Sequence, residues 1–161
     1  MTPRRFGGLR ADIQLELNNL ERLMDEIGDL PLDAPANILI VRGVGSALHD
    51  LYSGTEKIFQ LIALNLDGDL PRGEDWHTQL LRRMSTPVPD VRPPVITSDL
   101  EVNLSEYLRF RHVFRNIYGF ELKWHRLREL VDHVPGVYSQ LREQVEAFLR
   151  FLAELDQATS D

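Results

Sequence analysis

The apolar residues between positions 38 and 66 recur every three or four positions, and this spacing constrains the fold more than any other feature of the chain. Residues spaced in this way lie on one face of an α-helix, so the segment predicts a single helix of roughly 25 to 30 residues. Gly43, Gly45 and Ser46 lie inside it, and each glycine costs about 1 kcal/mol relative to alanine. We therefore expect a kink there or the close approach of a second helix. The apolar positions are Ile38, Val41, Val44, Leu48, Leu51, Tyr52, Phe59, Ile62 and Leu66.

The same periodicity predicts helices along the rest of the chain, and no segment alternates apolar and polar residues as a strand would. A length of 161 residues is typical of one domain. We therefore predict an all-α fold, a bundle of about five to six helices that forms a single domain over residues 1–161. The further predicted helices cover about 9–27, 74–84, 98–118, 123–132 and 135–155.

Local signals predict where several helices begin and end. Asp33 is typical of an N-cap for the long helix. Ser98 with Glu101 three residues later fits a capping box, and Gly119 is expected to end the helix that starts there. Four of the nine prolines lie in 86–94, which predicts an extended connection.

Composition excludes several classes of protein. The chain has no cysteine, which excludes disulfides, a thiol nucleophile and cysteine-containing zinc sites. No two of the five histidines are spaced to share a helical metal site, and no phosphate-binding glycine motif is present, so we expect neither a metal nor a cofactor. The N-terminal segment has basic residues without an apolar run, and 58–66 is too short to span a bilayer. We expect a cytoplasmic protein without a membrane partner.

Charge is distributed unevenly along the chain. The net charge is −7, which argues at first against a nucleic-acid partner. Residues 109–128, however, contain six basic residues and one acidic residue, interleaved with aromatic side chains, so this segment carries +5 and the remainder −12. The stripe is either a focused anion site or a set of arginines that pair with acidic neighbours on other helices.

Two polar clusters project from different sides of the predicted helix 98–118. The first consists of Arg111, Arg115 and Tyr118, and the second of Arg109, His112 and Asn116. Core contacts between them are expected from Phe110, Val113, Phe114 and Ile117. Two polar stripes on one helix are reasonable if the helix lines a cleft, for example between two copies of the chain.

Asp75, Trp76 and His77 form a further noteworthy triplet. We interpret Trp76 as the residue that docks a short helix on the bundle, with His77 hydrogen-bonded to a nearby group, in preference to a functional site.

Three separated segments carry a resemblance to a known family: 48–59, 70–81 and 110–120. Together they resemble the HepT-like branch of the HEPN ribonuclease toxins, over most of the chain. The family motif is an arginine, four to six residues, a histidine, one residue and a tyrosine. Arg111 and Tyr118 match its ends, and Asn116 stands where the histidine is expected.

The resemblance implies a symmetric homodimer whose motifs meet in a basic cleft and cut RNA without a metal, by attack of the ribose 2′-OH. Arg111 and the motif position Asn116 would be catalytic, and the basic side chains Arg109, Arg115 and Lys123 would bind RNA. A minimal nucleotidyltransferase antitoxin would adenylylate Tyr118, which adds bulk and negative charge to the cleft.

Asn116 departs from this pattern because an amide does not exchange protons in the useful pH range. Three explanations stay open: His112, one turn earlier, moves the proton; the arginine and the oriented 2′-OH suffice; or the chain is inactive. The alternative function is thus a catalytically silent RNA- or nucleotide-binding module, and a third is a helical adaptor for an acidic protein partner.

Overall fold

The computed structural model describes residues 5–33 and 35–160, which fold into five α-helices without a β-strand. The helices are α1 (Gly7–Gly28), α2 (Ile38–Ile62), α3 (Trp76–Met84), α4 (Ser98–Asn116) and α5 (Trp124–Ser160). A π-helical turn, η1 (Ala63–Asp67), extends α2, and a 3-10 turn, η2 (Gly119–Glu121), precedes α5. The all-α prediction is confirmed, with five helices in this part of the chain.

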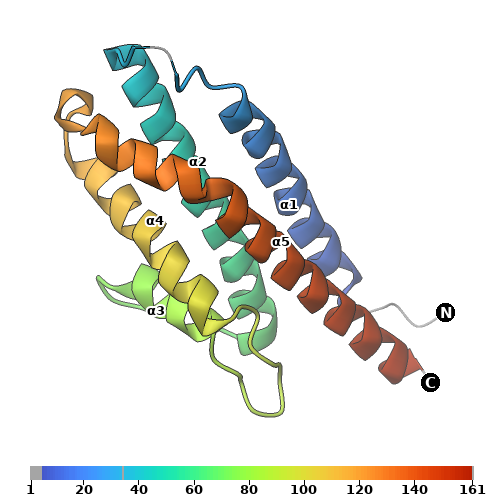
Figure 1. Ribbon diagram of the computed structural model, residues 1–161. Helices are drawn as coiled ribbons and strands as arrows, with labels where there is room; N and C mark the ends of the chain where they lie inside the picture. The colour runs from blue at the N-terminus through green and yellow to red at the C-terminus, as the bar shows by residue number, and fades with distance from the viewer. Residues whose placement is uncertain (1–4, 34, 161) are drawn as a thin grey trace.

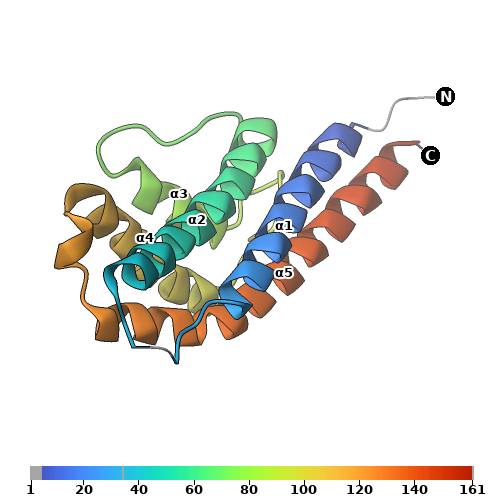
Figure 2. The ribbon, with the colours of Figure 1, turned by 90° about the horizontal axis from the view of Figure 1, so that it is seen from above.

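Helices α1 and α2 lie side by side; α4 packs against α2, and α5 packs against α1, α2 and α4 (Figure 1). The short helix α3 lies against α2 and α4 near the end of α2, as the view from above also shows (Figure 2). Phe6 N donates to Asp156 Oδ1 at 2.9 Å and so joins the start of α1 to the last turns of α5. None of the helices in 5–33 and 35–160 is long and apolar enough to cross a membrane.

The glycines of α2 act through close packing. A Cβ atom at Gly45 would lie 2.9 Å from the Phe114 ring of α4, and one at Gly54 would lie 2.7 Å from Leu20 of α1. The expected close approach of a second helix is therefore confirmed at Gly45, whereas Gly43 has no neighbour within 4 Å of such an atom.

The helix at the C-terminal end differs from the prediction. Residues 123–132 and 135–155 were expected as two helices, but α5 is continuous and Pro135 lies inside it. Proline removes one backbone hydrogen bond and bends a helix, and α5 bends near its middle (Figure 1). Burial of Val131, Val134, Val137 and Tyr138 on both sides of the proline holds the two halves together.

Several predicted ends are also shifted. Asn37, and not Asp33, caps α2, because its side chain accepts hydrogen bonds from the Leu39 and Ile40 amides; Ala34, which follows the predicted cap, lies outside the described residues. Thr97 takes the cap that the sequence assigned to Ser98. Helix α4 ends at Asn116, so Tyr118 follows the helix instead of lying on it.

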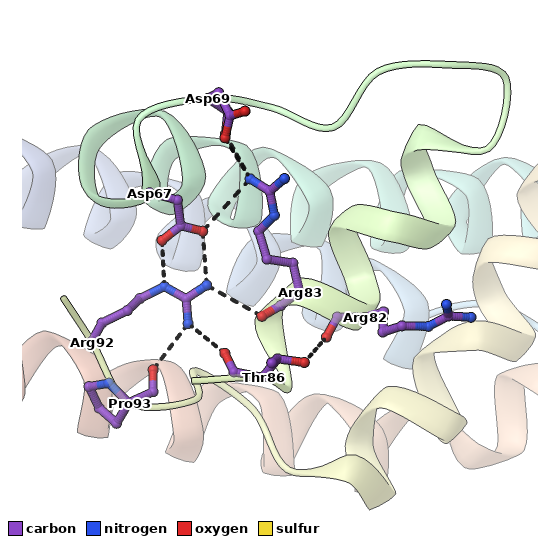
Figure 3. A network of polar contacts seen from close by, with 7 residues as sticks. All are labelled: Asp67, Asp69, Arg82, Arg83, Thr86, Arg92 and Pro93. Carbon is purple, nitrogen blue, oxygen red and sulfur yellow. Dashed lines mark hydrogen bonds and ion pairs between the residues drawn. The ribbon is translucent and has the colours of Figure 1, made fainter. Parts of the chain in front are cut away.

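The proline-rich connection folds back on itself instead of running extended. Val88 and Arg92 exchange two backbone hydrogen bonds of 3.0 Å around a turn in which Asp90 has a φ of 63°. The Arg92 side chain is fully buried, and its five N–H groups all donate: to both oxygens of Asp67 and to the carbonyls of Thr86, Pro93 and Arg83 (Figure 3). We call this network the Arg92 clamp; it joins the end of η1 to the end of α3.

Replacing Arg92 by alanine is expected to lower the free energy of unfolding by about 3 to 5 kcal/mol, because the Asp67 carboxylate would stay buried without its partner. Urea or guanidinium denaturation followed by circular dichroism measures this loss. Arg82→Ala is the matched control, since the Arg82 side chain is exposed and points away from the network (Figure 3). A loss below about 1 kcal/mol, as for an exposed ion pair, would contradict the assignment.

Candidate functional site

Arg111, the first residue of the motif, points into the bundle. Its side chain is 14 % exposed, and its Nη1 lies 3.6 Å from Oε1 of Glu56 on α2 and 3.3 Å from Nδ1 of His77 on α3. Helix α4 contributes the arginine because three buried residues in its first part, Leu100, Leu104 and Tyr107, fix its rotation on the core. The side chain of the motif arginine therefore contacts both α2 and α3.

Glu56 is the acidic centre of this group. Its side chain is 4 % exposed, and both carboxylate oxygens lie 2.8 Å from His77 Nδ1. The His77 ring stacks on Trp76 with 3.7 Å between ring centroids. A buried carboxylate is stable only when it is paired, so the Arg111 charge compensates Glu56 while the His77 contact satisfies its oxygens. We name these three residues the Glu56–His77–Arg111 cluster.

Tyr52 lies one helical turn before Glu56 and is fully buried. Burial raises the pKa of Tyr52 far above its ordinary value, the Glu56 charge raises it further, and the Arg111 charge opposes both. Within the described residues the Tyr52 hydroxyl and Arg111 Nε have no hydrogen-bond partner. Tyr52 therefore stays neutral at physiological pH and cannot act as a base.

Neither Glu56 nor His77 is among the site residues predicted from the sequence. A signal for Glu56 was present, because it falls on the apolar face of α2, four residues after Tyr52 and three before Phe59. A carboxylate on that face requires a basic partner. The predicted hydrogen bond of His77 to a nearby group is confirmed by the Glu56 contact, and its ring stacks on Trp76.

The other motif residues of α4 lie away from this cluster. Asn116 is exposed and donates from Nδ2 to the His112 carbonyl at 2.6 Å, so its amide engages its own helix. The His112 side chain is exposed and has no polar partner in the described part of the chain. Because Arg111 and Asn116 are five residues apart, they point about 140° away from each other within one copy. A single chain does not bring Arg111 together with Asn116.

Tyr118 lies beyond the end of α4, on the surface. It is 70 % exposed, and its ring stacks on Phe120 with 5.2 Å between centroids and 9° between planes. The Tyr118 amide donates to the Glu121 carboxylate, and a Cβ at Gly119 would lie 2.7 Å from the Arg42 guanidinium. These contacts place the tyrosine on a short, fixed turn beside the start of α2.

The basic stripe divides into paired and unpaired side chains. Arg111 pairs with Glu56, Arg109 with Glu106, and Arg128 with Asp132 and Asp33. The other three cations are exposed and have no ion pair within 5–33 and 35–160: Arg115, Lys123 and Arg126. Among the described residues of the stripe, only Arg111 therefore pairs with a carboxylate on another helix, because Glu106 and Asp132 lie on the same helices as their partners and Asp33 lies between helices.

A groove of about 450 Å³ lies between the second half of α4 and the start of α5. Arg109, Lys123 and Arg126 line it, and Arg115 does not. Three glutamates line the same groove, so its formal charges balance: Glu106, Glu121 and Glu129. Its apolar floor includes Phe110, which is half-buried. Among the described residues no group of three or more histidines and carboxylates is arranged to hold a metal ion.

A family model described as HepT-like protein matches residues 43–152, which include the Glu56–His77–Arg111 cluster and Tyr118. The match covers well over half of the chain, so the protein belongs to the HepT-like family of HEPN proteins. No curated protein and no solved structure matches the chain. The resemblance seen in the sequence is thereby confirmed at the level of the family.

Replacing Glu56 by alanine is expected to lower the free energy of unfolding by about 3 to 5 kcal/mol, because the Arg111 charge would lose its buried partner. Glu56→Gln should cost less, since the amide oxygen still accepts a hydrogen bond. Chemical denaturation measures both variants, with Lys57→Ala, an exposed neighbour, as the control. Equal stability of Glu56→Ala and the control would show that the carboxylate does not hold the cluster.

Proposed function

We propose that this protein is the toxin of a HEPN toxin–antitoxin pair, a metal-independent endoribonuclease that a minimal nucleotidyltransferase neutralises. The observation that carries the proposal is the arginine–asparagine–tyrosine motif of Arg111, Asn116 and Tyr118 in a HepT-like protein, together with three unpaired cations in the same stretch: Arg115, Lys123 and Arg126. Exposed cations without ion-pair partners are available to phosphate groups.

The chemistry requires no group that the chain lacks. The ribose 2′-OH loses its proton as its oxygen attacks the adjacent phosphorus, the bond from phosphorus to the 5′-oxygen breaks, and the 5′-oxygen takes up a proton. A 2′,3′-cyclic phosphate and a 5′-OH form. Negative charge develops on the phosphoryl oxygens, and the guanidinium of Arg111 is suited to stabilise it. Arg115 and Lys123 bind the flanking phosphates of the RNA backbone, and Arg109 and Arg126 lie at the neighbouring groove. His112 and Asn116 lie on the outer side of α4.

The exposed end of α4 is suited to pack against a second copy of the chain. After Tyr107 no residue of α4 is fully buried, and apolar side chains stay exposed at this end of the molecule: Val113 at 47 %, Tyr118 at 70 % and Phe120 at 69 %. A second copy that packs on this face would cover these apolar side chains.

Adenylylation of Tyr118 would inhibit such a cleft. The tyrosine is exposed on a short turn, which makes its hydroxyl reachable by a nucleotidyltransferase. The added phosphate is negatively charged and would compete with RNA for the same cations, including Arg115.

The purified protein is expected to cleave total RNA in the presence of EDTA. Arg111→Lys should slow cleavage at least tenfold, because the lysine ammonium cannot make the bidentate hydrogen bonds of a guanidinium. Gel or capillary electrophoresis of the products measures the rates. Arg150→Ala, which removes an exposed arginine on the far half of α5, should cleave as the wild type does.

RNA binding without cleavage would contradict the ribonuclease and support the silent binding module instead. In that case Asn116→His, which restores the motif imidazole, is the variant that should gain activity. Neither binding nor cleavage would reject both functions in favour of a helical adaptor.

Co-expression with a minimal nucleotidyltransferase of the kind proposed as the antitoxin should add whole AMP units to the protein. Intact-mass spectrometry detects these AMP units, and they should disappear in Tyr118→Phe. They should persist in the control Tyr138→Phe, because the Tyr138 hydroxyl is engaged in a hydrogen bond to Glu21. Increments that survive Tyr118→Phe would place the modification on another residue.

A further inference from the structure

The imidazole nearest to the motif arginine belongs to His77 on α3, outside the motif. The motif itself supplies an amide, Asn116, where proton transfer needs a titrating group. Arg111 Nη1 approaches His77 Nδ1 to 3.3 Å, whereas neither His112 nor Asn116 contacts the arginine in one copy.

We propose that His77 is the general base of the ribonuclease reaction, with Glu56 as its positioning residue. The inference rests on the proposed ribonuclease function and assigns its proton transfer to a side chain of α3. The Glu56–His77–Arg111 cluster then supplies the proton-transfer group that the motif lacks at Asn116.

The hydrogen bonds of His77 determine which nitrogen is available. Glu56 is buried and both its oxygens lie 2.8 Å from Nδ1, so Nδ1 carries the proton and donates it to the carboxylate. The lone pair is then on Nε2, which has no polar partner in the described part of the chain. Stacking on Trp76 fixes the plane of the ring. With 26 % of its side chain exposed, the imidazole is anchored at one edge and reachable at the other.

No other described histidine combines an oriented ring with a buried carboxylate. His49 lies 3.5 Å from Asp50, whose side chain is 62 % exposed. The Nδ1 atom of His133 contacts the backbone carbonyl of Glu129 on its own helix. His112 and His125 have exposed side chains without a polar partner within 5–33 and 35–160. Among the described histidines, His77 is therefore the one whose ring contacts a buried carboxylate.

The charges of the cluster suit a base that becomes protonated during the reaction. The charged groups that contact His77 are Glu56 from α2 and Arg111 from α4, so one negative and one positive charge lie beside the imidazole. When Nε2 accepts a proton, the cluster gains one positive charge at the moment the phosphoryl oxygens gain negative charge.

The step balances without a further reactant. His77 Nε2 takes the proton of the ribose 2′-OH, the 2′-oxygen forms a bond to phosphorus, and the bond from phosphorus to the 5′-oxygen breaks with its electron pair on that oxygen. The leaving oxygen then takes up the proton that the imidazolium releases, which restores neutral His77. Arg111 Nη1 lies 3.3 Å from Nδ1, on the Glu56 side of the ring, and in this proposal its guanidinium holds the charged phosphoryl oxygens next to the imidazole.

The test compares cleavage of one RNA by the wild type, His77→Ala, His77→Gln and His133→Ala, each as the full-length protein in EDTA. General-base catalysis contributes about 10²- to 10⁴-fold, so His77→Ala should lose at least a hundredfold in rate. Glutamine retains a donor for Glu56 but cannot exchange a proton, so His77→Gln should be equally slow while it melts near the wild-type temperature. His133→Ala should be unchanged. Free imidazole in the buffer should restore part of the rate of His77→Ala, which a purely structural role would not allow.

Two results would overturn the inference, and they are distinguishable. If the wild type cleaves and His77→Gln cleaves at the same rate, His77 is not the base and the ribonuclease function stands; loss of activity in His112→Ala would then assign the proton transfer to α4. If the wild type does not cleave any RNA, the ribonuclease function fails, and the role of His77 fails with it.

Discussion

The buried guanidinium of Arg92 is the interaction on which the geometry of the site depends. All five of its N–H groups are satisfied, two by Asp67 at the end of η1 and three by carbonyls around the end of α3 (Figure 3). A buried arginine is tolerated only with such complete pairing, so the loop can adopt essentially one conformation around it. The clamp therefore sets where α3 lies along α2, and with it the distance from His77 to Glu56, which lies 21 residues earlier in the chain.

The helices were predictable because their apolar periodicity is a local property of the chain. The errors arose where tertiary contacts decide. Pro135 reads locally as a break, but buried valines and Tyr138 on both sides keep α5 continuous. The choice of Asn37 over Asp33 as a cap depends on where α2 can start against its neighbours, which the residue types alone do not reveal.

The candidate site was predictable only in part, for a related reason. The motif of Arg111, Asn116 and Tyr118 lies in one short segment, so it can be recognised from the sequence alone. Glu56 and His77 come from two other helices, and their meeting with Arg111 requires the packing of α2, α3 and α4 to be known. The same holds for the basic stripe, because only the fold separates the arginines that have acidic partners from those that do not.

A carboxylate on the inner face of α2 also has a consequence for how the protein assembles. A hairpin of α1 and α2 alone can bury its leucines, but Glu56 can leave water only when its cationic and imidazole partners are present. Those partners, Arg111 and His77, are supplied by different helices. The docking of α3 and the docking of α4 are thereby coupled, so neither helix completes the core without the other.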